Sequence, residues 1–181
     1  MTNSNAQGHY LRAVPPALTA RPARLADGPA ITAIYNQGIE DRVGTFETEP
    51  RAVDQIEAWF KHAKAFVTVE DAAGAVVGYA VAHPYADRCC YAGIGEFSVY
   101  IRRDQRGRGV GRVAMTALTQ ASQAAGLWKL LSRVFPENRA SLKLMAWSGF
   151  KEIGVHEKHG KLDGVWRDCV IVERVFPENL N

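Results

Sequence analysis

The sequence has few cysteines, no long apolar run and little net charge. Its three cysteines, Cys89, Cys90 and Cys169, form no C-x-x-C pair, so they predict neither a disulfide framework nor a metal site. Nothing resembles the run of about eighteen apolar residues that a membrane-spanning helix needs. A net charge of +3 on a chain with mostly scattered arginines does not favour nucleic-acid binding. We therefore expect an ordinary globular protein with reduced thiols, located in the cytoplasm.

Length and composition predict one folded domain. The chain has 181 residues, of which 47% are apolar and 23% are charged, as is typical of soluble domains. No internal repeat is visible. The polar, proline-containing start favours a flexible tail at residues 1–19, a domain at 20–176 and a short C-terminal tail at 177–181.

Apolar periodicity and turn residues predict a mixed α/β fold. The order of strands and helices does not strictly alternate, so we expect a mixed sheet with helices on both faces. Irregular loops are expected at 38–50 and 84–93, and a polar loop at 158–164. The predicted strands are 21–24, 65–70, 76–83, 96–101, 129–134, 152–157 and 165–174, and the predicted helices start near 28 and span about 53–64, 110–125 and 139–148.

A glycine-rich turn connects the predicted strand at 96–101 to the helix that starts near Val110. Free N–H groups at a helix N-terminus, reached through glycines, favour a bound phosphate. The turn is not a Walker A loop, because Arg112 and Val113 follow its last glycine, and it does not fit G-x-G-x-x-G. Its pattern is Arg106-x-x-Gly109-x-Gly111, which predicts a pyrophosphate cradle of another type.

That pattern resembles the pyrophosphate loop of the GCN5-related N-acetyltransferases (GNAT). Over about residues 20–176 the chain looks like the phosphinothricin and arsinothricin N-acetyltransferase branch of that family. The predicted element order matches the same family. Six segments carry the closer resemblance: 34–36, 45–50, 78–80, 87–91, 96–101 and 157–168.

The resemblance implies a mostly antiparallel sheet that splays around acetyl-coenzyme A (acetyl-CoA). It implies acetyl transfer to the α-amino group of a small amino acid analogue such as phosphinothricin, arsinothricin or methionine sulfoximine, giving resistance to an antimetabolite. It further implies a homodimer that needs no metal and has no nucleic-acid or membrane partner.

The resemblance also assigns roles to residues. Glu96, a carboxylate in an otherwise apolar strand, matches the family's general base, although a solvated glutamate at a strand end would look the same. The backbone of Val99 and Ile101 is expected to pair with the pantetheine arm, and Asn138 either to bond it or only to cap a helix. The expected cofactor-binding residues are Ser98, Val99, Tyr100, Ile101, Arg106, Gly107, Arg108, Gly109, Val110, Gly111, Arg112 and Asn138.

Four further residues are expected at the acceptor. Arg88, with Tyr91 nearby, has the bidentate donors that suit a phosphinate, arsinate or carboxylate, although a solvated loop arginine is an alternative. Phe46 would wall the pocket or serve as a plain core anchor. His159 would assist anion binding or be simply solvated.

Two points stay open in the sequence. The helix at 139–148 offers no histidine or tyrosine near its middle, where Met145 stands, so no side chain is assigned as proton donor to the leaving thiolate. The acceptor could also be a polyamine or a protein N-terminus, or the chain could bind acyl-CoA without turnover. The presence of Glu96 argues against the last possibility.

Overall fold

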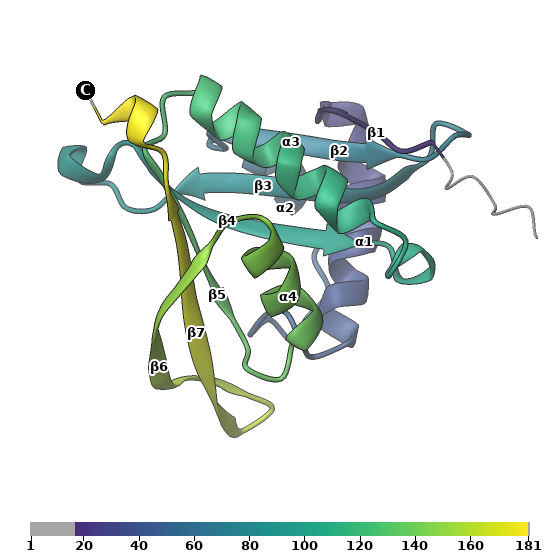
Figure 1. Ribbon diagram of the computed structural model, residues 1–181. Helices are drawn as coiled ribbons and strands as arrows, with labels where there is room; N and C mark the ends of the chain where they lie inside the picture. Colours follow the sequence, from purple (N-terminus) through teal and green to yellow (C-terminus); the bar gives the residue numbers. More distant parts are fainter. Residues whose placement is uncertain (1–16, 181) are drawn as a thin grey trace, which may run out of the picture.

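The computed structural model describes residues 17–180, which form one seven-stranded sheet flanked by helices (Figure 1). The strand order is β1-β2-β3-β4-β5-β7-β6. All neighbouring strands are antiparallel except β4 and β5, which run parallel. The strands are β1 Thr19–Pro22, β2 Ala65–Glu70, β3 Val76–Pro84, β4 Ile94–Ile101, β5 Lys129–Val134, β6 Lys151–Leu162 and β7 Val165–Val175.

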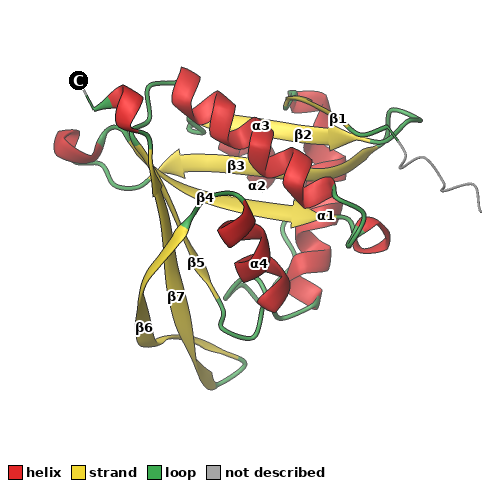
Figure 2. Cartoon of the chain, in the orientation of Figure 1, coloured by secondary structure: helices red, strands yellow, loops and turns green. Residues whose placement is uncertain are grey.

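Helices cover both faces of the sheet, as predicted (Figure 2). The helices are α1 Gly28–Glu40, α2 Val53–Glu57, α3 Val110–Ala124 and α4 Arg139–Trp147. Buried side chains of α3 and Met145 of α4 pack with one face of β2–β4. Residues of α1 and α2 pack with Tyr79 and Val81 on the opposite face. The mixed α/β architecture and the two helical layers are therefore confirmed.

The parallel pair β4 and β5 separates soon after it forms, and this separation positions the functional site. Their register covers only Ile94, Gly95 and Glu96 of β4, against Lys129, Leu130 and Leu131 of β5. β4 continues to Ile101 beside β3, whereas β5 continues beside β7. The two strands diverge plainly in Figure 1, with α4 next to the gap. The edge of β4 that faces β5 consequently lacks a strand partner beyond Glu96 within residues 17–180.

The C-terminal hairpin differs from the sequence prediction. The polar loop expected at 158–164 is instead the end of β6 and a tight turn at Asp163 and Gly164. Both turn residues have positive φ, 49° and 80°, which is the geometry of a two-residue hairpin turn of type I′. Polar side chains did not prevent strand formation, because they lie on an exposed edge strand.

Other boundaries also move. The helix expected at 53–64 is a single α-helical stretch, α2, followed by a 3-10 turn at Ala58–Lys61. β1 begins at Thr19, inside the range expected as a tail, and residues 1–16 of that tail lie outside the described residues. The end of the chain is also attached: Asn179 Nδ2 donates to the carbonyl oxygens of Gln123 and Leu127, both at 2.8 Å.

Two absences hold for the described part of the chain. No helix there combines the length and apolarity that crossing a membrane requires. Nor do three or more His, Cys, Asp or Glu side chains group there in a way that could hold a metal ion.

Candidate active site

A cleft of about 1280 Å³ opens where β4 and β5 separate. Its walls come from β4, the glycine-rich turn, the start of α3, α4, the loop after α1 and the end of β5. Most of the predicted site residues line this cleft: Phe46, Glu96, Ser98, Val99, Tyr100, Ile101, Arg106, Gly107, Gly109, Gly111, Arg112, Asn138 and His159. A set of residues chosen from distant parts of the sequence thus meets at one site.

The glycine-rich turn has the backbone geometry that its sequence suggested. Gly107 and Gly109 have φ of 76° and 89°, and Gly109 is the residue that precedes α3. An added Cβ at either position would meet no atom within 4 Å, so the surface there is open. The first N–H groups of a helix have no intrahelical partner, so those of Val110 and Gly111 are available to an anion. Val110 contributes only its backbone, because its side chain is buried in the core.

The arginines around this turn differ in how they are used. Arg106 Nε donates to the carbonyl oxygen of Ile101 at 3.1 Å, and its Nη1 lies 2.5 Å from Asp41 Oδ2. Its charge is therefore balanced by the protein itself. Arg112 places its guanidinium 4.8 Å from the centre of the Trp147 ring. Arg108 is exposed and does not line the cleft, which corrects its expected place there.

The strand β4 supplies the long wall of the cleft. Residues Ser98 to Ile101 pair with β3 on one side and face the gap on the other. An extended ligand can add to such an edge through main-chain hydrogen bonds. The side chain of Tyr100 packs at 5.0 Å from the Tyr35 ring, and its hydroxyl donates to the carbonyl oxygen of Gly44 at 3.0 Å. Burial raises the pKa of both phenols, so both stay protonated near neutral pH.

Glu96 is the last residue of β4 that pairs with β5, at the point where the cleft begins. Its carboxylate contacts Nη2 of Arg133, which projects from β5. The side chains are 33% and 38% exposed, so both can reach a ligand in the cleft. A carboxylate held at the cleft and open to solvent suits the acceptance of a proton from a bound amine.

His83 is the cross-strand neighbour of Glu96 on β3. Directly opposed residues of an antiparallel pair share a face of the sheet. Burial lowers the pKa of His83 from its ordinary value, against a weaker opposing effect of Glu96. The imidazole is therefore neutral at pH 7 and lines the cleft beside Trp59, whose ring lies at 5.4 Å.

Asn138 performs the capping role at the start of α4. Its Oδ1 accepts from the Ser141 N–H at 3.0 Å, and its Nδ2 donates to the carbonyl oxygen of Val43 at 2.9 Å. The cap is confirmed, and the second bond ties the loop after α1 to α4. Contact with pantetheine remains a prediction for this residue, which does line the cleft.

Phe46 and His159 line the cleft and lie close to each other. Phe46 packs edge-on against Phe135 at 4.8 Å, and its ring lies 6.4 Å from that of His159 on β6. Gly160 is required here, because a Cβ at this position would come within 2.8 Å of the Phe46 ring. Phe46 is thus both an anchor of a small buried cluster and a wall of the cleft.

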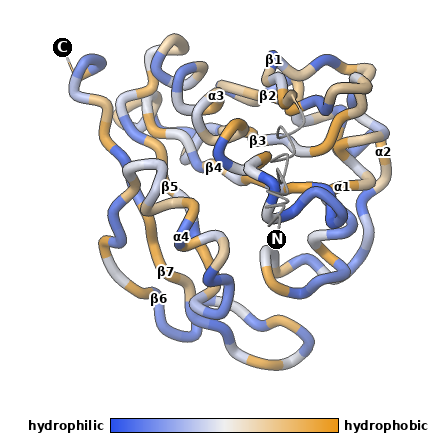
Figure 3. Tube along the Cα trace, turned by 45° about the vertical axis from the view of Figure 1, so that its right-hand side comes forward, coloured by the Kyte–Doolittle hydropathy of each residue, from blue (hydrophilic) through white to orange (hydrophobic). Residues whose placement is uncertain are grey.

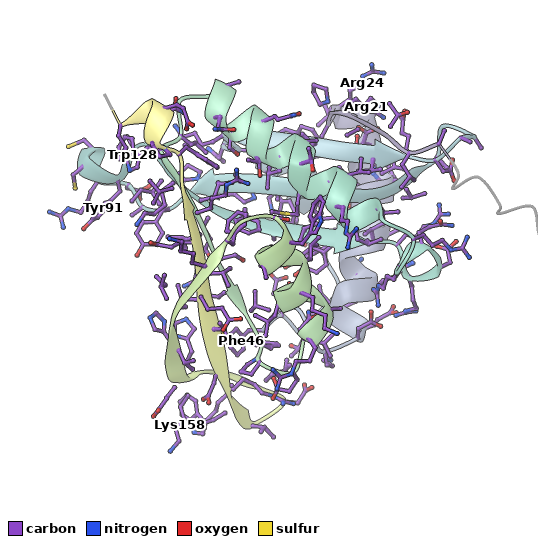
Figure 4. The ribbon with its side chains drawn as sticks, in the orientation of Figure 1. Arg21, Arg24, Phe46, Tyr91, Trp128 and Lys158 are labelled. Carbon is purple, nitrogen blue, oxygen red and sulfur yellow. The ribbon has the colours of Figure 1, made fainter. Side chains whose placement is uncertain are left out.

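Arg88 and Tyr91 lie elsewhere, which corrects their expected position at the acceptor. Neither lines the cleft. Their loop precedes β4 and is tied to the segment before β5, because the carbonyl oxygen of Gly93 accepts from the N–H of Trp128 at 2.8 Å. Figure 4 shows Tyr91 near Trp128 and far from Phe46. Arg88 instead places its guanidinium 5.7 Å from the centre of the Tyr91 ring.

Arg133 and His83 line the cleft as well, and neither was predicted as a site residue from the sequence. The register of the antiparallel pair β3–β4 would have identified His83, because it places this residue directly opposite Glu96. Arg133 could have been considered as a site residue because it is the one arginine in the strand 129–134. No local motif marks either residue.

Comparison with known proteins identifies the family. Residues 17–151 match the family described as the acetyltransferase (GNAT) domain. The chain is 32% identical over 157 residues to the L-methionine sulfoximine/L-methionine sulfone acetyltransferase of Pseudomonas aeruginosa, covering 84% of this chain and 91% of that protein. It is 35% identical over 164 residues to the phosphinothricin N-acetyltransferase of Alcaligenes faecalis, covering 87% and 82%.

Solved structures agree with the sequence comparison. A phosphinothricin acetyltransferase from Sinorhizobium meliloti, solved in complex with acetyl-CoA, superimposes with a TM-score of 0.82 at 28% identity and covers 89% of both chains. The parted strands, the glycine-rich turn and the carboxylate at the start of the gap are consistent with that ligand. The chain therefore belongs to the GNAT family of acetyltransferases and is an acetyl-CoA-dependent N-acetyltransferase.

Proposed function

We propose that this enzyme acetylates the α-amino group of a small amino acid analogue, of the phosphinothricin, arsinothricin or methionine sulfoximine type, and so gives resistance to such antimetabolites in the cytoplasm. The observation that carries the proposal is one cleft that joins a glycine-rich turn at a helix N-terminus, Gly107–Gly111, to a solvent-accessible carboxylate, Glu96, at the opposite end of β4. The relatives whose names specify methionine sulfoximine and phosphinothricin support the acceptor class.

In this proposal each part of the cleft has a task. Acetyl-CoA supplies an activated thioester. The N-terminus of α3 and the two positive-φ glycines hold its pyrophosphate, and the free edge of β4 aligns its pantetheine arm. The Val99 N–H is our candidate donor to the oxyanion that develops on the thioester oxygen.

Glu96 removes the proton that an ammonium must lose before its nitrogen can attack. As the nitrogen bonds to the acetyl carbon, the carbon–sulfur bond breaks and coenzyme A leaves as a thiolate. α4 offers no tyrosine or histidine as its proton donor, because Met145 is buried and neither residue type lies between Arg139 and Trp147. A coenzyme A thiol is acidic enough to leave as a thiolate near neutral pH, so the thiolate can take its proton from water.

A panel of acceptors tests the proposal. The release of free thiol from acetyl-CoA is measured with phosphinothricin, arsinothricin, methionine sulfoximine, a polyamine and a peptide with a free N-terminus. We expect turnover with at least one of the amino acid analogues and a kcat/KM at least about tenfold lower for the polyamine and the peptide, a difference of about 1.4 kcal/mol. A higher kcat/KM for the polyamine or the peptide would show that this compound represents the acceptor class instead. Thiol release that no acceptor stimulates would refute the proposal.

We also propose a homodimer that uses the β6–β7 hairpin. The hairpin includes the edge strand β6, and apolar residues lie among its polar ones (Figure 3). Four of its large apolar side chains are more than half exposed. Edge strands and apolar patches of this kind are commonly covered by a partner. The exposed side chains are Ile153, Val155, Val165 and Trp166, each more than half exposed. Light scattering is expected to give twice the chain mass, and a monomer at micromolar concentration would contradict the proposal.

A further inference from the structure

The cleft contains a pair of opposite charges, Glu96 and Arg133, and the proposed reaction uses only the carboxylate. Arg133 contacts Glu96 from across the gap between β5 and β4. The pairing of these strands ends at Glu96 and Leu131, and Arg133 follows two residues later on the same face of β5. The guanidinium therefore stands at the point where an acceptor must meet Glu96.

Most of the donors of Arg133 are available to a ligand. Within residues 17–180, the hydrogen bond to Glu96 is the one recorded for its guanidinium, which has five N–H donors. Two other arginines that line the cleft have their charge balanced within the protein. Arg51 bonds both oxygens of Glu47 at 2.6 and 2.7 Å, and Arg106 pairs with Asp41. Arg133 is thus in contact with the proposed base and retains donors that can bind an additional anion.

We infer that Arg133 binds the α-carboxylate of the acceptor, so that Glu96 and Arg133 together select a free α-amino acid. This inference rests on the proposed function. A zwitterion brings one ammonium and one carboxylate on the same carbon atom. When it binds, its ammonium pairs with Glu96 and its carboxylate pairs with Arg133. Each protein side chain thus replaces its contact with the other by a contact with the ligand. No charge is therefore left without a partner. An unpaired charge in a partly enclosed site would cost free energy.

The same pair disfavours the other acceptors that the sequence left open. A polyamine brings positive charge without a carboxylate, so Arg133 would lose its partner and be repelled by the ammonium. A protein N-terminus has a peptide carbonyl in place of the α-carboxylate and cannot accept a bidentate charged hydrogen bond from a guanidinium. Arg133 thus takes the anion-binding role expected of Arg88, but for the carboxylate on the carbon that bears the reacting nitrogen.

The test compares two acceptors that differ only at the carboxylate. One is the best amino acid of the acceptor panel, and the other is its α-carboxamide. We expect wild-type kcat/KM to be at least about tenfold higher for the amino acid, which corresponds to about 1.4 kcal/mol. Arg133→Ala should raise KM for the amino acid at least about tenfold, leave KM for acetyl-CoA unchanged and abolish the preference over the carboxamide. Arg133→Lys should restore part of the preference, because an ammonium keeps the charge but loses the fork.

Arg167→Ala is the matched control. Arg167 forms a comparable ion pair with Glu137 at 3.1 Å, does not line the cleft and should keep the wild-type preference. If Arg133→Ala lowers turnover of both acceptors by the same factor, Arg133 only positions Glu96 and the inference is wrong. If the wild-type enzyme acetylates the two acceptors equally, the inference is wrong without any variant. If neither is acetylated, the proposed function itself fails.

Discussion

Replacing Glu96 by glutamine is expected to lower kcat by about 10²–10⁴-fold, the range typical of a lost general base. Glutamine keeps the size of the side chain and an oxygen that can accept from Arg133, so the cleft should retain its shape. It cannot take a proton from the bound ammonium. The defect should shrink as the pH rises, because more of the acceptor then arrives as free amine. Steady-state kinetics over a range of pH measure both effects.

Glu173→Gln provides the control for this substitution. Glu173 is also a partly exposed glutamate on a strand that has neighbours on both sides, β7, and it pairs with Lys129 at 2.8 Å, outside the cleft. Its kcat should stay close to wild type at every pH. A Glu96→Gln enzyme with wild-type turnover at neutral pH would show that another group, with His83 as the nearest candidate, accepts the proton.

Placing a carboxylate in the glycine-rich turn is expected to abolish acetyl-CoA binding. Gly109→Glu sets a negative charge at the N-terminus of α3, where the pyrophosphate is proposed to lie. Like charges about 4 Å apart near a protein surface repel by about 4 kcal/mol, and screening by salt reduces this. We therefore expect the Kd for acetyl-CoA, measured by titration calorimetry, to rise at least about a hundredfold.

Gly74→Glu separates this charge effect from backbone strain. Gly74 has φ of 78°, close to the 89° of Gly109, and a Cβ at either position meets no atom within 4 Å. Both variants bear the same penalty for a side chain at positive φ, but Gly74 lies in the turn between β2 and β3, away from the cleft. Gly111 is a less clean probe, because its Cβ would lie 3.0 Å from Leu144. If wild type and Gly109→Glu bind acetyl-CoA with equal affinity, the pyrophosphate does not bind at this turn.

The elements that the sequence predicted well are those that local pattern determines. β2 and β5 match the predicted ranges, and α3 ends one residue before the predicted position. Their apolar periodicity, and the glycines that flank α3, specify them without help from distant residues. The glycine turn and Glu96 were found for the same reason, since both lie within one strand–turn–helix segment.

The hairpin of β6 and β7 shows where composition misleads. The residues from Lys158 to Leu162 are mostly polar, as loops often are, but they extend an edge strand with one exposed side. The informative signal was the dipeptide Asp163-Gly164, which favours a two-residue turn between paired strands. Turn chemistry was a better guide here than hydrophobicity.

The anion-binding arginine could not be placed from local sequence. Arg88 precedes Glu96 by eight residues and its loop enters the same end of β4, but a 3-10 turn and the contact of Gly93 with Trp128 hold that loop outside the cleft. Arg133 is far from Glu96 in the sequence and adjacent to it in space, because the parallel pairing of β4 with β5 sets them together. Such neighbours follow from sheet order and register, which a single strand does not encode.

The most direct test of acetyl transfer to the α-nitrogen is to identify the product. The purified enzyme is incubated with acetyl-CoA and methionine sulfoximine, and the products are analysed by mass spectrometry and NMR. The account predicts the N-acetylated amino acid with its acetyl group on the α-nitrogen, in a one-to-one ratio with released coenzyme A. Release of coenzyme A together with free acetate and unchanged amino acid, or an acetyl group on another atom, would contradict it.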